Sequence, residues 1–354
     1  MKKTGSLLFA LAVLLMLSTS TQAQDPHFSQ FNSTPLLSNP ANTGLFNGCY
    51  RFTGIYRSQW HSILKFESVP LYRTYSGSFD MRINNGISKH DAWGVGLAFL
   101  SDKAGESEFG TTGGLVSFSY MKALNQKGNH YLSLGFAGGL AQRTINFNRL
   151  RWGEQFDGEG YNANLPSNEN ITSNNFIYFD ISAGAMWYYV KDKRTNFYAG
   201  FSAYHMNQPN QSFYNIESVP LYMHLTFTGG VQFGLGGQVD LVPAVLFMTQ
   251  GPAMETSIGS YLKFFFEQRN PLGNAFYIGP WYRIVGDMNK ALTSEALILA
   301  ARIDYGSFTL GMSYDLNFSE LTRATNGQGG FEVTANYIIK CRDKRPDVKF
   351  CPRF

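Results

Sequence analysis

Six histidines are the residues of this sequence best suited to acid–base chemistry, because a neutral imidazole is the commonest general base near pH 7. A nucleophilic site would also need a serine and an orienting group that converge on one of them. Most of the histidines fall in predicted turns, loops or the terminal segment, and the sequence contains no H-E-x-x-H, G-x-S-x-G or phosphate-loop motif. We therefore predict a protein that is not an enzyme and uses no cofactor. The histidines are His27, His61, His90, His130, His205 and His224.

A short acidic stretch is the candidate for a metal site. Asp102, Glu106 and Glu108 lie in a predicted outer loop and carry the oxygen ligands that Ca²⁺ prefers. A solvated acidic loop explains the same residues without a ligand. No cysteine has the spacing to a histidine that a zinc site needs. We therefore predict no metal site.

The composition excludes several classes of protein. Of the 354 residues, 15% are charged and 16% are aromatic, whereas soluble proteins average about 25% charged residues. No segment after the N-terminal region has the roughly 18 to 20 unbroken apolar residues of a membrane helix. The net charge of +4 is too small to indicate a nucleic-acid partner.

Alternating apolar and polar residues recur throughout the chain in short stretches. In residues 307–316, every second residue from Phe308 to Leu316 is apolar. A period of two predicts a strand with one apolar face and one wet face. We therefore predict an all-β fold, a transmembrane antiparallel β-barrel of the outer membrane with about 14 strands. The predicted strands are 49–60, 71–83, 92–100, 112–124, 131–144, 176–190, 196–206, 220–235, 238–249, 254–267, 275–285, 292–305, 307–316 and 330–340.

The N-terminus has the pattern of a cleavable export signal. Lys2 and Lys3 precede an apolar core, Leu7 to Leu17, that is too short to span a membrane, and small residues precede the expected cut after Ala23. An even number of strands places both termini in the periplasm, and the longest connections, which follow odd-numbered strands, outside the cell. The predicted parts are a signal peptide 1–23, a periplasmic N-terminal segment 24–48, a barrel 49–340 and a periplasmic C-terminal tail 341–354.

The same alternation assigns four charged residues to the barrel interior. Arg51 and Arg57 alternate with aromatic residues in the first strand, as Asp315 and Glu332 do in the last two. An Arg or Lys on the lipid face costs about 2 to 4 kcal/mol at the bilayer midplane. We therefore place these four side chains in the lumen, where they stiffen the barrel or contact a substrate or plug.

Three cysteines leave at least one thiol without a partner in the same chain. Cys341 can pair with Cys351 in a short tail loop, or with Cys49 across the seam where the first and last strands meet. We favour the tail loop, because its closure needs no particular strand register.

Several short motifs together resemble the PorP/SprF family, outer-membrane proteins of the type IX secretion system of Bacteroidetes. The resemblance covers essentially the whole chain after the export signal. It is carried by Asp25-Pro26-His27-Phe28-Ser29-Gln30-Phe31, Asn39-Pro40-Ala41, Gly44, Tyr56-Arg57-Ser58-Gln59-Trp60, Asn207-Gln208-Pro209, Tyr282-Arg283, Tyr314-Asp315 with Ser319, and Gly330-Phe331-Glu332 before Tyr337.

The resemblance implies a non-enzymatic component that supports secretion or cell-surface anchoring of client proteins, such as gliding adhesins. Its implied partners are outer-membrane lipid, a secreted client protein with a C-terminal sorting domain, and periplasmic type IX secretion components. A passive porin or small-solute outer-membrane transporter is the alternative. The basic tail offers docking residues for a periplasmic component: Arg342, Lys344, Arg345, Phe350 and Phe354.

Overall fold

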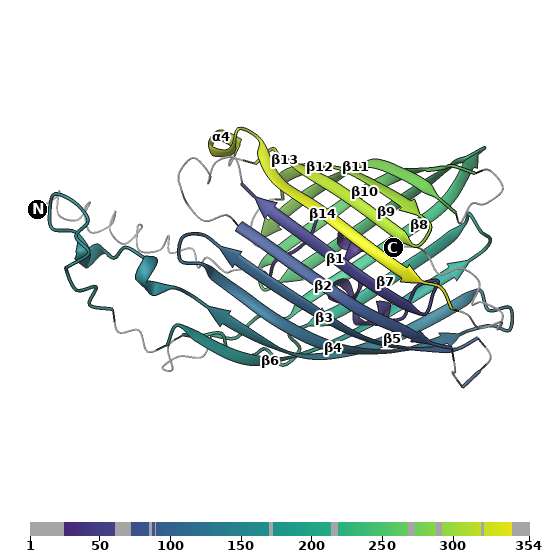
Figure 1. Ribbon diagram of the computed structural model, residues 1–354, viewed down its shortest axis with the longest axis horizontal. Helices are drawn as coiled ribbons and strands as arrows, with labels where there is room; N and C mark the ends of the chain where they lie inside the picture. The colour runs from purple at the N-terminus through teal and green to yellow at the C-terminus, as the bar shows by residue number, and fades with distance from the viewer. Residues whose placement is uncertain are drawn as a thin grey trace, which may run out of the picture.

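The computed structural model describes residues 25–60, 72–84, 87–88, 90–169, 173–213, 219–267, 273–287, 292–319 and 322–341. Within them, fourteen strands close into one antiparallel barrel in which β1 (Tyr50–Gln59) pairs with β14 (Gln328–Ile339) (Figure 1). The predicted all-β barrel is therefore confirmed, whereas the predicted signal peptide and tail residues 342–354 lie outside the described residues. The other strands are β2 (Tyr72–Ile83), β3 (Ala92–Ala104), β4 (Phe109–Ala123), β5 (His130–Thr144), β6 (Asn175–Val190), β7 (Asn196–Tyr204), β8 (His224–Gly236), β9 (Val239–Gln250), β10 (Ala253–Phe265), β11 (Ala275–Asp287), β12 (Thr293–Tyr305) and β13 (Phe308–Asn317).

Side chains alternate between the outer face and the lumen along each strand. In β14, Phe331, Val333 and Tyr337 are exposed on the outer face, while Glu332 and Thr334 are buried on the inner face. The sheet therefore offers an apolar outer band and a polar interior, as the period-two pattern predicts. Among the described residues, no helix is long and apolar enough to cross a membrane.

The two ends of the barrel differ in the length of their connections. The end reached by odd-numbered strands, here called the loop rim, carries the long connection between β5 and β6 and the short helix α4 (Thr322–Thr325) (Figure 1). The opposite end, the turn rim, carries tight turns such as Gly306 between β12 and β13. Gly306 has a φ of +60°, which glycine adopts without the steric cost of a side chain.

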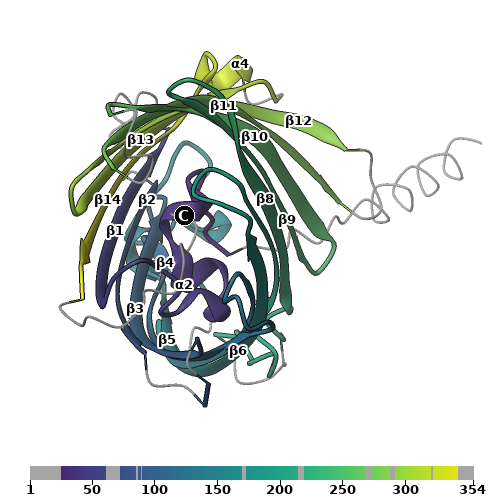
Figure 2. The same ribbon diagram turned by 90° about the vertical axis from the view of Figure 1, so that its right-hand side faces the viewer.

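The N-terminal segment (25–48) lies inside the barrel. It contains η1 (Phe31–Ser33), α2 (Pro35–Ser38) and η2 (Pro40–Asn42), and it runs through the lumen (Figure 2). Its first described residue lies near the loop rim, whereas its end reaches the turn rim, where β1 begins. We expected this segment beyond the barrel, beside the C-terminal tail. That placement is wrong, because the segment's backbone groups find hydrogen-bond partners on the lumen wall.

Glycines in the wall make room for the N-terminal segment. A Cβ atom on Gly94, Gly135 or Gly184 would collide with atoms of Thr43, with the backbone of Pro40 and Ala41, or with Asn39. These glycines occupy lumen-facing positions of β3, β5 and β6 in one row across the sheet. The wall is thus shaped to the backbone of the segment, as glycine permits at close approaches.

A disulfide between Cys49 and Cys341 ties the start of β1 to the end of β14, with Cα atoms 5.0 Å apart. The favoured pairing of Cys341 with Cys351 is therefore wrong, and the seam alternative is correct. Strand pairing explains the outcome, because Tyr50 lies directly opposite Ile339 and brings the two cysteines together.

Candidate functional site

Two groups of side chains hold the N-terminal segment in the lumen. The central charge cluster consists of Arg57, Arg283, Asp315, Glu332 and the segment residue Ser29. The rim cluster, nearer the loop rim, consists of Asp25, Asp180, His205, His224 and Gln250. Both clusters join residues that are far apart in the sequence.

The central charge cluster draws its charges from four strands, β1, β11, β13 and β14. The guanidinium of Arg57 pairs with Asp315 at 3.0 Å and with Glu332, and Arg283 pairs with Asp315 at 2.7 Å. These four side chains are at most 2% exposed. Two cations and two carboxylates therefore neutralise one another in the interior, where an unpaired charge would be very costly.

The N-terminal segment completes the hydrogen bonds of this cluster. The backbone N–H groups of Ser29 and Gln30 donate to the two oxygens of Glu332, at 2.7 and 2.9 Å. The Ser29 hydroxyl donates to Asp315 at 2.8 Å and accepts from Arg57 and Arg283 at 2.8 and 2.9 Å. The segment is therefore part of a connected buried network, the kind of arrangement that specifies one position.

Of the four predicted lumen residues, the structure brings three together: Arg57, Asp315 and Glu332. Arg51 also faces the lumen but lies closer to the turn rim, where it forms two bonds to Asp80 at 2.9 and 2.8 Å. Asp80 accepts in addition from the backbone N–H of Gly44 at 2.7 Å. Arg51 therefore supports a lower part of the same N-terminal segment.

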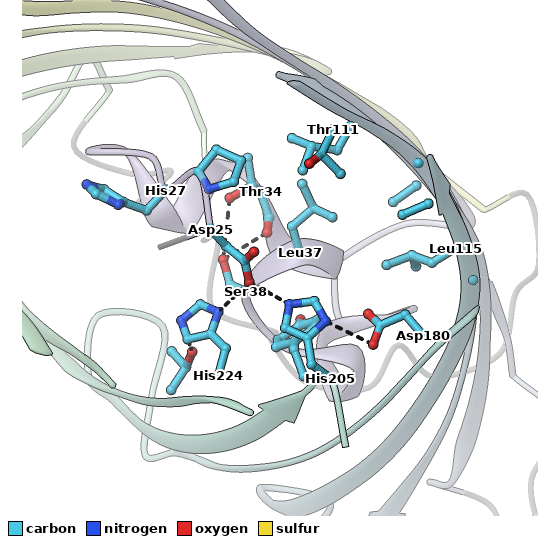
Figure 3. Close-up of a pocket in the computed structure, with 18 of the residues that line it drawn as sticks. Asp25, His27, Thr34, Leu37, Ser38, Thr111, Leu115, Asp180, His205 and His224 are labelled. Carbon is cyan, nitrogen blue, oxygen red and sulfur yellow. Dashed lines mark hydrogen bonds and ion pairs between the residues drawn. The ribbon is translucent and has the colours of Figure 1, made fainter. Parts of the chain in front are cut away.

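The rim cluster binds the first described residue of the chain (Figure 3). The backbone N–H of Asp25 donates to Gln250 Oε1 at 2.8 Å, and Gln250 Nε2 donates to the Asp25 carboxylate at 3.0 Å. His205 lies between two carboxylates, with Nε2 2.5 Å from Asp25 and Nδ1 2.9 Å from Asp180. His205 also has a φ of +55°, a backbone conformation that persists in non-glycine residues where the surrounding contacts enforce it.

The charges of this cluster stabilise each other. Burial would lower the pKa of His205, but the Asp25 carboxylate and the bonds to Asp180 and Asp25 outweigh it and raise the pKa to about 10. Burial would likewise raise the pKa of Asp25, yet the charge of His205 and its hydrogen bond lower it to about 2. The pair is therefore ionised over the physiological range of pH.

The described geometry suits anchoring better than catalysis. Both ring nitrogens of His205 are taken by carboxylates, and the nearby Ser38 hydroxyl donates to backbone carbonyls of Phe31 and Thr34. A nucleophile bonded to a free imidazole is therefore not formed here.

Two of the candidate calcium ligands, Asp102 and Glu108, have protein partners. Thr74 donates to Asp102 at 2.7 Å, and Arg149 pairs with Glu108 at 3.0 Å. In the part of the chain that the structure describes, no group of three or more His, Cys, Asp or Glu residues is arranged to hold a metal ion.

A cavity of about 160 Å³ lies between the N-terminal segment and the wall, next to the rim cluster (Figure 3). Phe28, Phe31 and Leu37 line it from the segment, and apolar residues of the wall line it from β3 to β9. Sequence reasoning did not find this cavity or the rim cluster. Two residues gave a possible signal: Asp25 begins one of the family motifs, and His205 lies two residues before another. Nothing in the sequence, however, indicated that the two would meet.

Sequence reasoning also missed Arg283. It lies within the quoted pair Tyr282-Arg283, and strand alternation would have placed Arg283 in the lumen. The proposed docking residues Arg342, Lys344, Arg345, Phe350 and Phe354 lie outside the described residues.

The closed barrel with an apolar outer band defines the class of the protein as an outer-membrane β-barrel. The chain belongs to the PorP/SprF family, since the model described as "Type IX secretion system membrane protein PorP/SprF" matches residues 20–337. A search of the curated proteins finds no match.

Solved structures of outer-membrane channels share the fold. A deletion mutant of the monoaromatic hydrocarbon channel TodX has a TM-score of 0.50 at 8% identity, covering 86% of this chain and 93% of that one. The monoaromatic hydrocarbon channel CymD has a TM-score of 0.49 at 8% identity, covering 88% and 94%. The toluene transporter TbuX of Ralstonia pickettii has 0.49 at 8% identity, covering 87% and 94%. At such low identity the likeness shows the fold alone.

Proposed function

We propose that this protein is a non-enzymatic outer-membrane component of type IX secretion that supports the secretion or cell-surface anchoring of client proteins, such as adhesins with a C-terminal sorting domain. The observation that carries the proposal is the family match over most of the chain. Membership of the PorP/SprF family identifies the secretion system. The kind of client protein is inferred from the role of the family in that system.

The filled lumen supports a role other than free solute passage. The N-terminal segment crosses the interior and is bonded to the wall at three levels, through Asp25, Ser29 and Gly44. Side chains alone fill barrels of about 8 strands, whereas barrels of 16 to 18 strands leave an aqueous channel, so in this 14-strand barrel the segment takes up lumen space that side chains would leave open. A barrel closed in this way can serve as a rigid platform whose two rims contact other proteins.

The loop rim offers a surface for a client. The connection between β5 and β6 contains η3 (Phe147–Arg149) and η4 (Gly153–Gln155) and extends beyond the barrel (Figure 1). Phe156 and Tyr161 pair as an isolated bridge there and are 60% and 45% exposed. In the proposed orientation this rim faces outward, and the basic tail meets the periplasmic components of the system.

The test is secretion itself. Deleting the gene should reduce the amount of client proteins in the medium or on the cell surface, measured by quantitative mass spectrometry, and the full-length gene should restore them. A variant without residues 342–354 should insert normally but restore secretion poorly, because the docking residues are gone. Normal secretion in the gene deletion contradicts the proposal, and normal secretion in the tail variant contradicts only the role of the tail.

The alternative is a passive porin or small-solute transporter, which the likeness of the barrel to channel structures keeps open. It predicts steady single-channel conductance of the purified protein in planar bilayers. The proposed platform with a filled lumen predicts no steady conductance in the same bilayers. Stable conductance by the full-length chain would favour the porin.

A further inference from the structure

The cavity beside the rim cluster owes its space to small residues on the lumen wall. Two rows of laterally paired residues cross β3, β4, β5 and β6 at this level, and each row contributes two residues no larger than alanine to the inner face. The rows are Ala98–Leu115–Gly139–Asp180 and Leu100–Gly113–Ala141–Tyr178, all of which line the cavity.

Small residues lower in the lumen have a different neighbour. A Cβ atom on Gly94 or Gly184 would strike the N-terminal segment, so the segment fills the space that those glycines leave. Cβ atoms on Gly113 and Gly139 would instead strike the wall itself, at Ala141 and the Leu140 carbonyl or at the Gly114 carbonyl and Leu115. The segment therefore packs closely against small wall residues near the turn rim, whereas a cavity remains between segment and wall beside the rim cluster.

The unfilled hollow has one polar end. Both ring nitrogens of His205 lie within hydrogen-bond distance of a carboxylate, Asp180 or Asp25, and this arrangement favours the protonated imidazolium, which donates to both. Among the residues that line the cavity, this end presents two carboxylates, Asp25 and Asp180, around the one cation His205. Arg143 lies outside the lining, where its guanidinium donates to Thr111 and Gln211 farther toward the loop rim, although its charge still acts on Asp25 and lowers the pKa of that carboxyl.

We propose that this cavity is a binding site for a small aromatic amine about one ring in size. A volume of about 160 Å³ matches a single benzene ring, since an engineered apolar cavity of about 150 Å³ takes up benzene. Phe28, Leu115 and Met248 supply apolar contacts around the ring. The carboxylate of Asp180 accepts from the ammonium group, a charge-assisted hydrogen bond.

The experiment measures ligand binding by ¹⁹F NMR with the full-length barrel in lipid nanodiscs, and empty nanodiscs serve as the reference. The probes are 4-fluorobenzylamine, 4-fluorotoluene and 4-fluorobenzoate. We expect saturable binding in the order amine, toluene, benzoate, because the ring fits the hollow and the carboxylates favour the cation. Signals no larger than those of empty nanodiscs overturn the proposal.

Two substitutions locate the site. Ala141→Leu should weaken binding of the amine by at least about tenfold, because the added side chain occupies the ring's space. Ala335→Leu makes the same change on the outer face of β14 and should leave binding unaltered. Equal affinity in both variants means that the probe partitions elsewhere, and the site is then wrong.

Asp180→Asn serves if Ala141→Leu does not fold. It keeps the shape of the cavity while removing the charge of one lining carboxylate, so it should weaken the amine several-fold and leave 4-fluorotoluene unchanged. An unchanged preference for the amine in this variant contradicts the assigned polar end.

Discussion

Replacing Glu332 with glutamine should loosen the N-terminal segment without opening the barrel. Both oxygens of Glu332 accept hydrogen bonds, one from Ser29 N and Arg57, the other from Gln30 N. A glutamine side chain retains one acceptor oxygen and turns an NH₂ group toward the remaining donors. At least one buried donor therefore loses its partner, and among the described residues Arg57 retains Asp315 as its counter-ion.

The structure sets the size of the effect. Arg57 and Glu332 both belong to the wall, so the loss of their ion pair affects the bound and the open segment alike. The bound segment alone loses a charged acceptor for two backbone N–H groups, those of Ser29 and Gln30. A hydrogen bond to a charged group contributes about 1.5 to 3 kcal/mol, and we take about 3 kcal/mol for the two bonds together. With ~1.4 kcal/mol for each factor of ten, the fraction of molecules with an open segment should rise about a hundredfold.

Hydrogen exchange measured by mass spectrometry resolves this change, because local opening controls the exchange of protected amides. Peptides that cover Ser29 and Gln30 should exchange faster in Glu332→Gln, while peptides from β3 to β6 should not. Glu295→Gln is the matched control, since Glu295 pairs with Arg283 from the wall but is 31% exposed and accepts no hydrogen bond from the described N-terminal segment. Exchange at Ser29 and Gln30 that stays within a factor of three of the unmodified protein would refute the reasoning.

Three further predictions concern the rim cluster, the seam and the orientation. The pKa of His205 is raised from 6.5 to about 10, so the stability that its protonation contributes is complete below pH 6.5 and is lost as pH rises through 10. The pKa of Asp25 is lowered from 3.8 to about 2, so the stability that its ionisation contributes is present above pH 3.8 and is lost as pH falls through 2. Protection of residues 25–31 from hydrogen exchange, corrected for intrinsic rates, should therefore be greater at pH 5 than at pH 10, and equal protection would count against the rim cluster. Non-reducing peptide mapping should recover a Cys49–Cys341 cross-link, and recovery of a Cys341–Cys351 peptide would contradict the seam pairing. The substitution Cys49→Ser should lower the temperature at which the barrel unfolds. Cysteines introduced at Asn164 and Asn210, both exposed near the loop rim, should react with an impermeant reagent on intact cells, whereas labelling only after rupture of the outer membrane would reverse the proposed orientation.

The barrel was predictable from the sequence because alternation is a local property. Phe331 and Glu332 are adjacent, and a strand alone decides that they face opposite sides. The same rule placed Arg51, Arg57, Asp315 and Glu332 in the lumen without any knowledge of their partners.

The partners and the path of the N-terminal segment were not predictable in this way. Ser29 meets Asp315 across 286 residues of sequence, and Asp25 meets His205 across 180. No local pattern distinguishes a proline-rich segment below a barrel from one inside it. The decisive features, such as Gly94 opposite Thr43, become meaningful only when the wall and the segment are seen together.

The seam disulfide closes the barrel covalently at one end only. The bond between Cys49 and Cys341 lies at the turn rim, where the N-terminal segment also joins β1. The first described residue of the segment, Asp25, lies at the opposite rim, beside Gln250. While the bond is intact, β1 and β14 can therefore separate only from the loop rim, like a zip with a fixed base. The fixed base and the tether of the segment coincide, so the segment stays attached beside the seam in any such opening, and the barrel and the segment can find each other again without a search.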